Sequence, residues 1–282
     1  MPSKPANIQL FTVSRSESGL PLQDYLALKL SLSRRRAKAL VDSKTVWINR
    51  SRVWMSHHVL KPGDQVQFPL AEGSKRQMPK LHALFEDDHY LFIDKPAGIV
   101  TVGENGTEEQ IQTQFQNPAY KAVHRLDRDT SGCLLVAKTP AAHAAAVALF
   151  KTRHVLKLYI AIAAGRMERA ASTLNEDLDG KRAVTHMSIL RAGRDATYLR
   201  LRIETGRTHQ IRKHLVAVRH PILGDREYGP AQVHDPRMRE VPRQMLHAVE
   251  IEMPHPMINH TTLRAHSPLP ADFRRCLKAF DL

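Results

Sequence analysis

The sequence predicts a protein of two domains, each built from both strands and helices. Three observations lead to this prediction. Leucines recur at helical spacing in residues 22–30, and apolar residues alternate with arginines in a hairpin expected within 187–207. Between these two patterns, the polar residues 71–80 include glycine and proline and indicate a linker. We therefore expect a smaller domain over 8–70 and a larger one over 81–282.

Composition limits the classes of function. The chain has 282 residues, 42% of them hydrophobic, which is enough to bury the cores of an ordinary domain and a smaller one. Lysine and arginine number 42 against 28 aspartates and glutamates, so the formal net charge is +14. Such a surplus favours a polyanionic partner, nucleic acid before an anionic membrane surface.

Neither a membrane protein nor a secreted one is expected. No apolar run approaches the roughly 18 residues of a spanning helix, and the N-terminus has no apolar signal segment. The two cysteines, Cys133 and Cys276, suit neither a disulfide framework nor a metal-ligand pattern. A reducing, cytoplasmic location is therefore expected.

An arginine-rich helix is the most informative part of the N-terminal domain. It is expected to begin after Ser33, a good N-cap, and to bury a stripe formed by Ala37, Leu40 and Val41. Its first turn, where the helix dipole disfavours cations, contains Arg34, Arg35 and Arg36. Two interpretations are open: a solvated basic face, or charges directed at phosphate groups. A hairpin turning near 49–51 and a Pro-Gly turn leading into a strand within 61–68 complete the domain.

Residues 124–132, HRLDRDTSG, form a dense polar cluster. Two carboxylates, Asp127 and Asp129, lie among three groups that are or can become cationic: His124, Arg125 and Arg128. The apolar run 133–137 follows as a buried strand, so the cluster is expected on a loop that enters the core. Guanidinium groups lower the pKa of a neighbouring carboxylate, and a carboxylate kept ionised suits a nucleophile or an electrostatic anchor. An ion-paired turn that only caps the strand is the alternative.

Local patterns predict the elements around this cluster. Two short strands are expected to flank a turn at Asp87 and Asp88, and residues 103–120 are expected to be a loop with one helical turn. After the cluster and its strand, Thr139 caps an alanine-rich helix that starts at Pro140.

The C-terminal half begins with a buried strand over 155–165, which contains Tyr159. A loop is expected over 166–183, before the hairpin within 187–207. Residues 205–221 then pass through a glycine into a helix whose core stripe is Ile211, Leu215 and Val218.

Three segments, in order along the chain, resemble the motifs of RluA-type pseudouridine synthases. The first is HRLD followed by TSG in 124–132, the second is KLYIA around Tyr159, and the third is GRTHQIR over 206–212. The resemblance extends over about residues 20–280. It implies an α+β fold in which helices flank a mixed, largely antiparallel central sheet.

The resemblance also implies roles for individual residues. It makes Asp127, rather than Asp129, the catalytic residue, although spacing alone does not choose between them. It places Tyr159 against the target base and makes Arg212 the ion-pair partner of Asp127, a role that suits the planar two-donor fork of arginine. Arg125 is expected to wedge into the position that the flipped uridine leaves. Further RNA contacts are expected from Arg34, Arg35, Lys38, Arg207 and His209.

Residues 20–68 resemble the S4 RNA-binding module. The matching features are the serine-arginine start of the second helix, the turn at Ile48 and Asn49, and the Pro-Gly-Asp turn. The chain departs from many such modules at 43–45 and at Arg50, where they have glycine. Together the resemblances imply an RNA pseudouridine synthase that acts as a monomer on structured RNA, with ribosomal RNA favoured over transfer RNA.

The implied reaction cleaves an N-glycosidic bond, turns the uracil and rejoins it to the ribose through carbon. It is redox-neutral and transfers no phosphoryl group, so no cofactor or metal is expected, and the chain has no P-loop, no GxGxxG after a strand and no zinc-ligand spacing. Asp127 either attacks the sugar or removes a proton to give a glycal. Two other functions stay open: an RNA-binding factor without catalysis, and a hydrolase that uses Asp127 and Asp129 as a carboxylate pair.

Neutral replacement of Arg34, Arg35 and Lys38 tests the predicted role of the arginine-rich helix. We expect weaker RNA binding and a smaller slope of log affinity against log salt concentration. Each phosphate contact that is lost reduces the number of counterions released when the RNA binds. Binding titrations at several salt concentrations measure the slope. An unaltered slope would count against the S4 interpretation.

Overall fold

The computed structural model describes residues 8–282, with the exception of 31, 33, 43, 44, 54, 70–79, 153, 169, 170 and 230–234. Only the backbone is described for Ile8, Arg35, Arg36, Ala39 and Pro69. The predicted N-cap Ser33 and the predicted linker, except its last residue, therefore lie outside the described residues. The chain divides into two compact units, Met1–Met78 and Pro79–Leu282. No helix in the described part of the chain combines the length and the apolar character that crossing a membrane requires.

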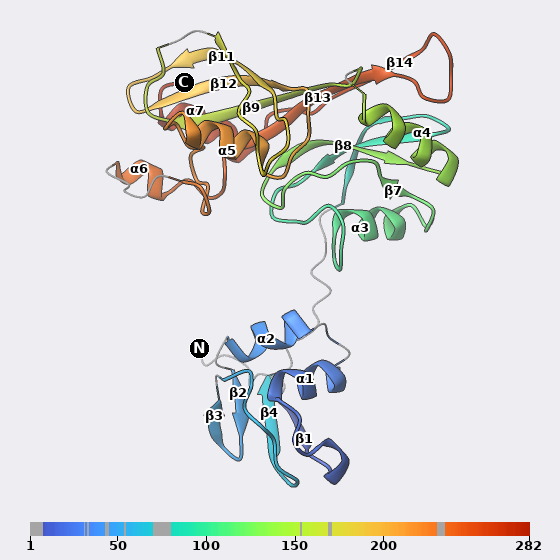
Figure 1. Ribbon diagram of the computed structural model, residues 1–282, viewed down its shortest axis with the longest axis vertical. Helices are drawn as coiled ribbons and strands as arrows, with labels where there is room; N and C mark the ends of the chain where they lie inside the picture. The colour runs from blue at the N-terminus through green and yellow to red at the C-terminus, as the bar shows by residue number, and fades with distance from the viewer. Residues whose placement is uncertain are drawn as a thin grey trace. The chain divides into compact units, whose positions relative to one another are not determined.

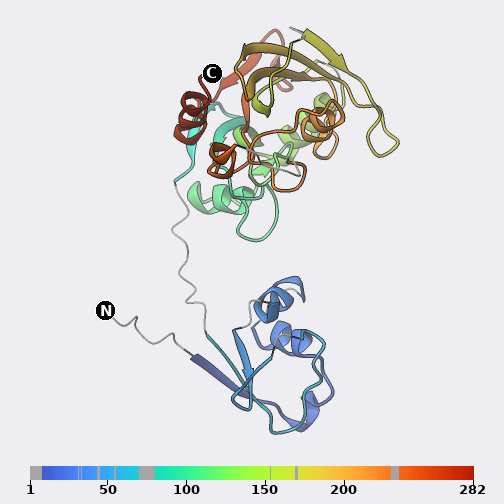
Figure 2. The ribbon, with the colours of Figure 1, turned by 90° about the vertical axis from the view of Figure 1, so that its left-hand side faces the viewer.

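The smaller unit is a four-stranded antiparallel sheet with two helices packed on one face (Figures 1 and 2). Its strands, in the spatial order β1-β4-β2-β3, are β1 (Ile8–Thr12), β4 (Gln65–Pro69), β2 (Val46–Ile48) and β3 (Ser51–Val53). Its helices are the short 3-10 helix η1 (Arg15–Glu17), α1 (Leu22–Leu30) and α2 (Arg34–Asp42).

The core of the smaller unit lies between the helices and the inner face of the sheet. The predicted helix over 22–30 is confirmed as α1, and it buries Leu22, Tyr25 and Leu26. Helix α2 contributes Ala37 and Val41 to the same cluster, which the sheet completes with Val46, Ile48, Val66 and Phe68. The predicted hairpin is confirmed as β2 and β3, joined by Asn49 and Arg50, both in the left-handed region with φ of 49° and 67°.

The larger unit is built on a ten-stranded sheet. Eight of its strands follow the path β10-β11-β12-β9-β13-β8-β6-β5, while β14 pairs with β13 and β7 with β8. The strands are β5 (His82–Glu86), β6 (Tyr90–Lys95), β7 (Lys121–Ala122), β8 (Ser131–Ala137), β9 (Leu156–Ala164), β10 (Ala171–Leu174), β11 (Thr185–Ala192), β12 (Ala196–Ile203), β13 (Leu246–Pro254) and β14 (Thr262–His266). The helices are α3 (Thr107–Gln114), α4 (Pro140–Phe150), α5 (Gln210–Ala217), α6 (Pro236–Arg239) and α7 (Ala271–Ala279). The predicted mixed, largely antiparallel sheet with flanking helices is confirmed (Figure 1).

Two segments expected to be loops contain regular structure. Within 103–120 the chain forms the eight-residue helix α3, because Ile111 is fully buried and this packing outweighs the polar sequence around it. Within 166–183 the chain forms β10, which pairs with β11 at the edge of the sheet. Its burial pattern leaves every residue at least partly exposed, so it lacks the apolar alternation by which a strand is recognised in a sequence.

The two halves of the large sheet meet where β8 and β13 run parallel. Here Ser131 and Gly132 pair with His247 and Ala248, at the point where the cluster 124–132 enters the core. Gly132 has a φ of 115°, and a Cβ atom on it would lie 2.2 Å from the carbonyl oxygen of Ala248. Only glycine therefore fits this position, and the close approach determines how the preceding loop enters the sheet.

Replacing Gly132 with alanine should destabilise the larger unit by more than about 3 kcal/mol, because the new methyl group adds a backbone clash to the unfavourable φ. Gly180→Ala is the matched control, since Gly180 also has a positive φ of 70° but has nothing within 4 Å of its Cβ direction. We expect a cost of about 1 kcal/mol there. Denaturant unfolding followed by circular dichroism measures both. Equal costs for the two substitutions would contradict the proposed clash.

Candidate active site

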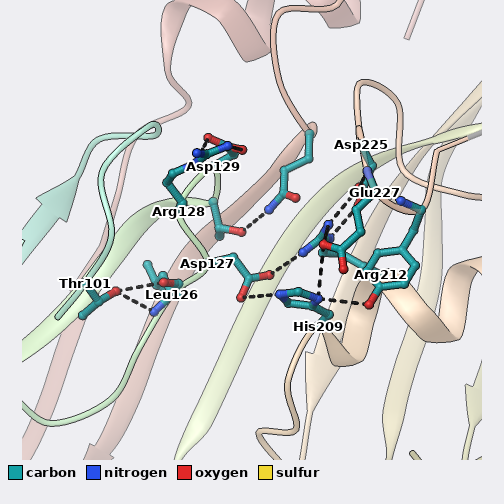
Figure 3. A network of polar contacts seen from close by, with 12 residues as sticks. Thr101, Leu126, Asp127, Arg128, Asp129, His209, Arg212, Asp225 and Glu227 are labelled. Atoms are coloured by element: carbon teal, nitrogen blue, oxygen red, sulfur yellow. Dashed lines mark hydrogen bonds and ion pairs between the residues drawn. The ribbon is translucent and has the colours of Figure 1, made fainter. Parts of the chain in front are cut away.

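Asp127 lies on the loop before β8 and lines a pocket of about 110 Å³. Its side chain is 21% exposed, so the carboxylate is neither buried in the core nor free in solvent. The pocket is also lined by residues from the other two sequence motifs: Tyr159, Arg207, His209 and Arg212. The fold thus brings together three segments that are separated by many residues in the sequence. Figure 3 shows two of them, with Asp127 beside His209 and Arg212.

Arg212 is the cation nearest to the carboxylate of Asp127. It belongs to α5, and its Nη1 lies 3.4 Å from Oδ2 of Asp127. Its strongest partner is Asp225, which accepts from Nε at 2.6 Å and from Nη2 at 2.9 Å, while Glu227 accepts from Nη2 at 3.0 Å. Burial acts to lower the pKa of Arg212, but these carboxylates raise it above its usual value. The guanidinium is therefore a fixed positive charge whose orientation Asp225 sets.

The burial of Arg212 corrects one expectation about α5. Its core stripe includes Ile211 and Leu215, as predicted, but Arg212 is itself only 6% exposed although it lies off that stripe. Arg212 therefore belongs neither to a solvated helix face nor to an exposed phosphate-binding surface. Carboxylates from the loop that follows α5 compensate the buried charge.

His209 occupies the side of the pocket next to Asp127. It precedes α5 in the left-handed conformation, with a φ of 54°. Its Nε2 lies 3.8 Å from Oδ1 of Asp127, and its Nδ1 lies 3.1 Å from the hydroxyl of Tyr228. The residue thus lies beside the carboxylate itself (Figure 3).

Tyr159 approaches the pocket from the sheet. It lies on β9, opposite Leu201 of β12 on one side and Ala248 of β13 on the other. Burial raises the pKa of the Tyr159 phenol, and the charge of Asp127 raises it further. The hydroxyl of Tyr159 therefore stays protonated at neutral pH. The side chain combines a flat apolar ring with a hydroxyl donor.

Side chains behind the pocket hold the loop of Asp127 through its backbone. The fully buried Lys95 donates from Nζ to the carbonyl oxygens of Asp127 at 3.4 Å, Arg128 at 3.2 Å and Thr130 at 2.9 Å. Burial lowers the pKa of Lys95 to about 7, whereas Asp129 and Asp127 act to raise it. The ring of carbonyls favours the ammonium form, which has three N–H donors where a neutral amine has two.

Three further residues complete this support. Thr101 donates from Oγ1 to the carbonyl of Leu126 at 2.8 Å and accepts from its amide at 3.0 Å. Arg243 donates to the carbonyl of Asp129 at 3.1 Å, and Gln244 donates to Thr130 Oγ1 at 2.7 Å. Since the bonds reach the loop on both sides of Asp127, its backbone position is held independently of any ligand.

The neighbours of Asp127 in the sequence do not surround it as expected. His124 is partly buried, stacks on Phe150 at 5.0 Å between ring centroids and accepts from the amide of Leu135, and desolvation lowers the pKa of its imidazole to about 3. It is therefore a neutral structural residue. Arg128 pairs with Asp129. Distant Arg212, rather than these neighbours, is the cation at the carboxylate.

Asp127 and Asp129 do not form a carboxylate pair. Asp127 lines the pocket described above, whereas Asp129 lines a different cavity of about 510 Å³ together with Arg243 and Asp272. Figure 3 shows the carboxylate of Asp127 beside Arg212 and that of Asp129 beside Arg128. Within the described part of the chain, no three or more histidine, cysteine, aspartate or glutamate side chains are grouped so that they could hold a metal ion. The geometry thus gives no support to the two-carboxylate hydrolase.

The other predicted RNA contacts fall into two places. Arg125 and Arg207 are exposed and line the pocket of Asp127, and Arg207 also donates to the carbonyl of Arg182 at 3.0 Å. In the smaller unit, the exposed side chains of Arg34 and Lys38 pair with carboxylates of that unit: Asp24 at 2.8 Å and Asp42 at 3.8 Å. The side chain of Arg35 lies outside the described residues.

Sequence reasoning missed Asp225, Glu227 and Lys95. Asp225 lies thirteen positions beyond Arg212 in a turn of ordinary composition, so no local pattern links the two. Lys95 is the last residue of an apolar strand, and this place in the sequence is a signal of burial.

The chain is similar to known proteins over most of its length. A profile of the RNA pseudouridylate synthase family matches residues 89–217. The ribosomal large subunit pseudouridine synthase D of Pseudomonas aeruginosa is 34% identical, over 80% of this chain and 83% of that protein. The protein of the same name from Nitrosomonas europaea is 33% identical, over 95% of this chain and 86% of that protein. Among solved structures, human RNA pseudouridylate synthase domain containing 1 matches with a TM-score of 0.59 and 26% identity, over 70% of this chain and 87% of that one.

Removal of the Asp225 carboxylate tests its role in compensating Arg212. Asp225→Ala should destabilise the larger unit by roughly 3–5 kcal/mol, because it leaves a buried guanidinium without its two-point partner. Glu227→Ala is the matched control: its side chain is 55% exposed, and we expect a cost below about 1 kcal/mol. The midpoint of urea unfolding measures both. Similar costs would show that Asp225 does not set the charge balance of the site.

Proposed function

Because the chain belongs to the RNA pseudouridylate synthase family, we propose that Asp127 is its catalytic residue and engages the ribose of a uridine in RNA. The observation that carries this proposal is the position of Asp127. Its carboxylate faces a pocket beside a fixed guanidinium at 3.4 Å, and the phenol of Tyr159 lines the same pocket. These three groups come from the three motifs that the sequence shares with the family.

The chemistry of the reaction fits such a site. The bond between N1 of uracil and C1′ of the ribose breaks, a bond between C5 and C1′ forms, the hydrogen on C5 leaves as a proton, and N1 takes up a proton. An ionised carboxylate next to the ribose serves either mechanism, attack on C1′ or removal of a ribose proton. Arg212 places a positive charge 3.4 Å from that carboxylate, and their attraction strengthens when a ligand displaces water from the pocket.

The remaining residues of the pocket suit the handling of a flipped base. A uridine stacked in RNA has to leave its stack before C1′ is accessible to a side chain. We propose that exposed Arg125 fills the vacated position and that the ring of Tyr159 contacts the extruded uracil. Exposed Arg207 at the rim is placed to contact a phosphate group.

Ribosomal RNA is the substrate class that we propose. The relatives from Pseudomonas aeruginosa and Nitrosomonas europaea are named for the large ribosomal subunit. The smaller unit, with its S4-like sequence features and exposed Arg34 and Lys38, is proposed as a second RNA contact. A monomeric state and a cytoplasmic location stay predictions.

Asp127→Asn tests the central proposal. RNA labelled with tritium at C5 of uridine releases the label only when a new bond forms at C5, so release reports the isomerisation. We expect the substitution to abolish release while the dissociation constant for RNA stays within about twofold of the parent value, because the amide keeps the shape of the side chain but not its charge. Release assays and binding titrations on the same RNA measure the two effects.

Asp129→Asn is the matched control. Asp129 lies two positions away and faces the other cavity, so this variant should retain most of the release activity. If Asp129→Asn abolishes release and Asp127→Asn does not, the assignment is wrong. A parent chain that binds RNA and releases no tritium would favour the RNA-binding factor instead.

A further inference from the structure

The sheet of the smaller unit has a second face that its core does not use. Helices α1 and α2 pack on the face formed by Val46, Ile48, Val66 and Phe68 (Figures 1 and 2). Side chains alternate between the two faces of a sheet, so the neighbouring positions point away from these helices. The strand register aligns four of them in one row across β1, β4, β2 and β3: Leu10, Gln67, Trp47 and Arg52.

This row presents apolar and aromatic surface to solvent. Leu10 is 50% exposed and Trp47 is 37% exposed, although both residue types are usually buried. The guanidinium of Arg52 lies over the indole of Trp47, with 4.8 Å between its Cζ and the ring centroid. The stack holds both flat groups in place on a rigid pair of strands.

The charges around the row favour an anionic ligand. The described outward side chains on these four strands are Leu10, Thr12, Trp47, Arg52, Gln65 and Gln67, and none of them is acidic. Arg50, exposed at the tip of the hairpin, adds a second cation near Arg52. Among the described residues, neither arginine has a carboxylate partner, in contrast to Arg34 and Lys38 on the helical side.

We propose that this face, hereafter the Trp47 face, binds an unpaired stretch of RNA by stacking a base on Trp47 and Arg52. Aromatic rings and guanidinium planes on a sheet accept any base through its π surface, and nearby arginines contact the backbone phosphates. Gln67, next to Trp47 in the row, offers amide groups for the edge of that base. The choice of RNA rests on the proposed function, while the face itself is distinct from the pocket of Asp127 and from the arginine-rich helix.

The experiment uses the full chain and two fluorescein-labelled probes. One is an oligoadenylate of about 12 nucleotides, which contains no uridine, and the other is an RNA duplex of the same length, whose bases are already stacked. Trp47→Leu should raise the dissociation constant for the oligoadenylate about tenfold, whereas Trp47→Phe, which keeps an aromatic face, should raise it less than about threefold. Both variants should bind the duplex within about twofold of the parent. Fluorescence anisotropy measures each constant.

Leu28→Ala is the matched control. Like Trp47, Leu28 is an exposed apolar side chain of the smaller unit, with 64% of its surface exposed, but it lies on α1 and not on the sheet. It should leave both constants unchanged. Arg52→Gln keeps the test decisive if Trp47→Leu melts at a lower temperature than the parent, because Arg52 is an exposed residue at the edge strand. It should weaken oligoadenylate binding about threefold and duplex binding less.

Several results would overturn the proposal. They are an unchanged oligoadenylate constant for Trp47→Leu, an equal loss for Trp47→Leu and Trp47→Phe, and an equal loss for oligoadenylate and duplex. A parent chain that sediments as a dimer, with a monomeric Trp47→Leu variant, would assign the face to a second copy of the chain. Because the probe lacks uridine, the binding result does not depend on tritium release. A failure of the proposed binding face is therefore distinguishable from a failure of the proposed catalytic function.

Discussion

The guanidinium of Arg212 is the constraint on which the rest of the site depends. It is almost entirely removed from solvent, so it has to be matched by negative charge, and three carboxylates surround it. Asp225 takes the short two-point contact and sets the orientation of the group. Asp127 is left with a single contact of 3.4 Å. Asp225 thus holds the guanidinium in place, while Asp127 shares its positive charge through a longer contact and stays available to a ligand.

The same logic explains why the loop of Asp127 is held from behind. A carboxylate that engages a sugar needs an orientation that does not depend on the ligand. Lys95, Thr101 and Arg243 bind backbone atoms of the loop and leave the carboxylate itself free. Gly132 permits the close approach of β8 and β13 that fixes where the loop ends. The sheet therefore positions the pocket through backbone contacts, while α5 supplies the charge.

The basic composition of the chain is distributed over surfaces with different chemistry. At the pocket, exposed Arg125 and Arg207 surround a carboxylate and a phenol, which suits a single extruded nucleotide. On α2, Arg34 and Lys38 each have an acidic neighbour, so their net attraction for phosphate is reduced. On the Trp47 face, Arg52 stacks on an aromatic ring and has no ion-pair partner among the described residues. Net charge alone indicates a polyanionic partner but does not distinguish these surfaces.

Local patterns in the sequence determined much of this protein. Leucine spacing placed α1 at its observed bounds, alternation placed β12, and the threonine-proline pair placed the start of α4, because each is a short-range effect of backbone and burial. The segments of Asp127, Tyr159 and Arg212 were recognisable as motifs. Tertiary structure alone decided which charges meet: His124 is a neutral, partly buried residue stacked on Phe150, Arg128 pairs with Asp129, and Asp225 reaches Arg212 from a later loop. It also decided that α3 and β10 form, since packing against the core and pairing at a sheet edge outweigh weak local signals. Ion pairs and the pairing of strands at a sheet edge form between residues that are distant in the sequence. Local sequence patterns therefore do not predict them.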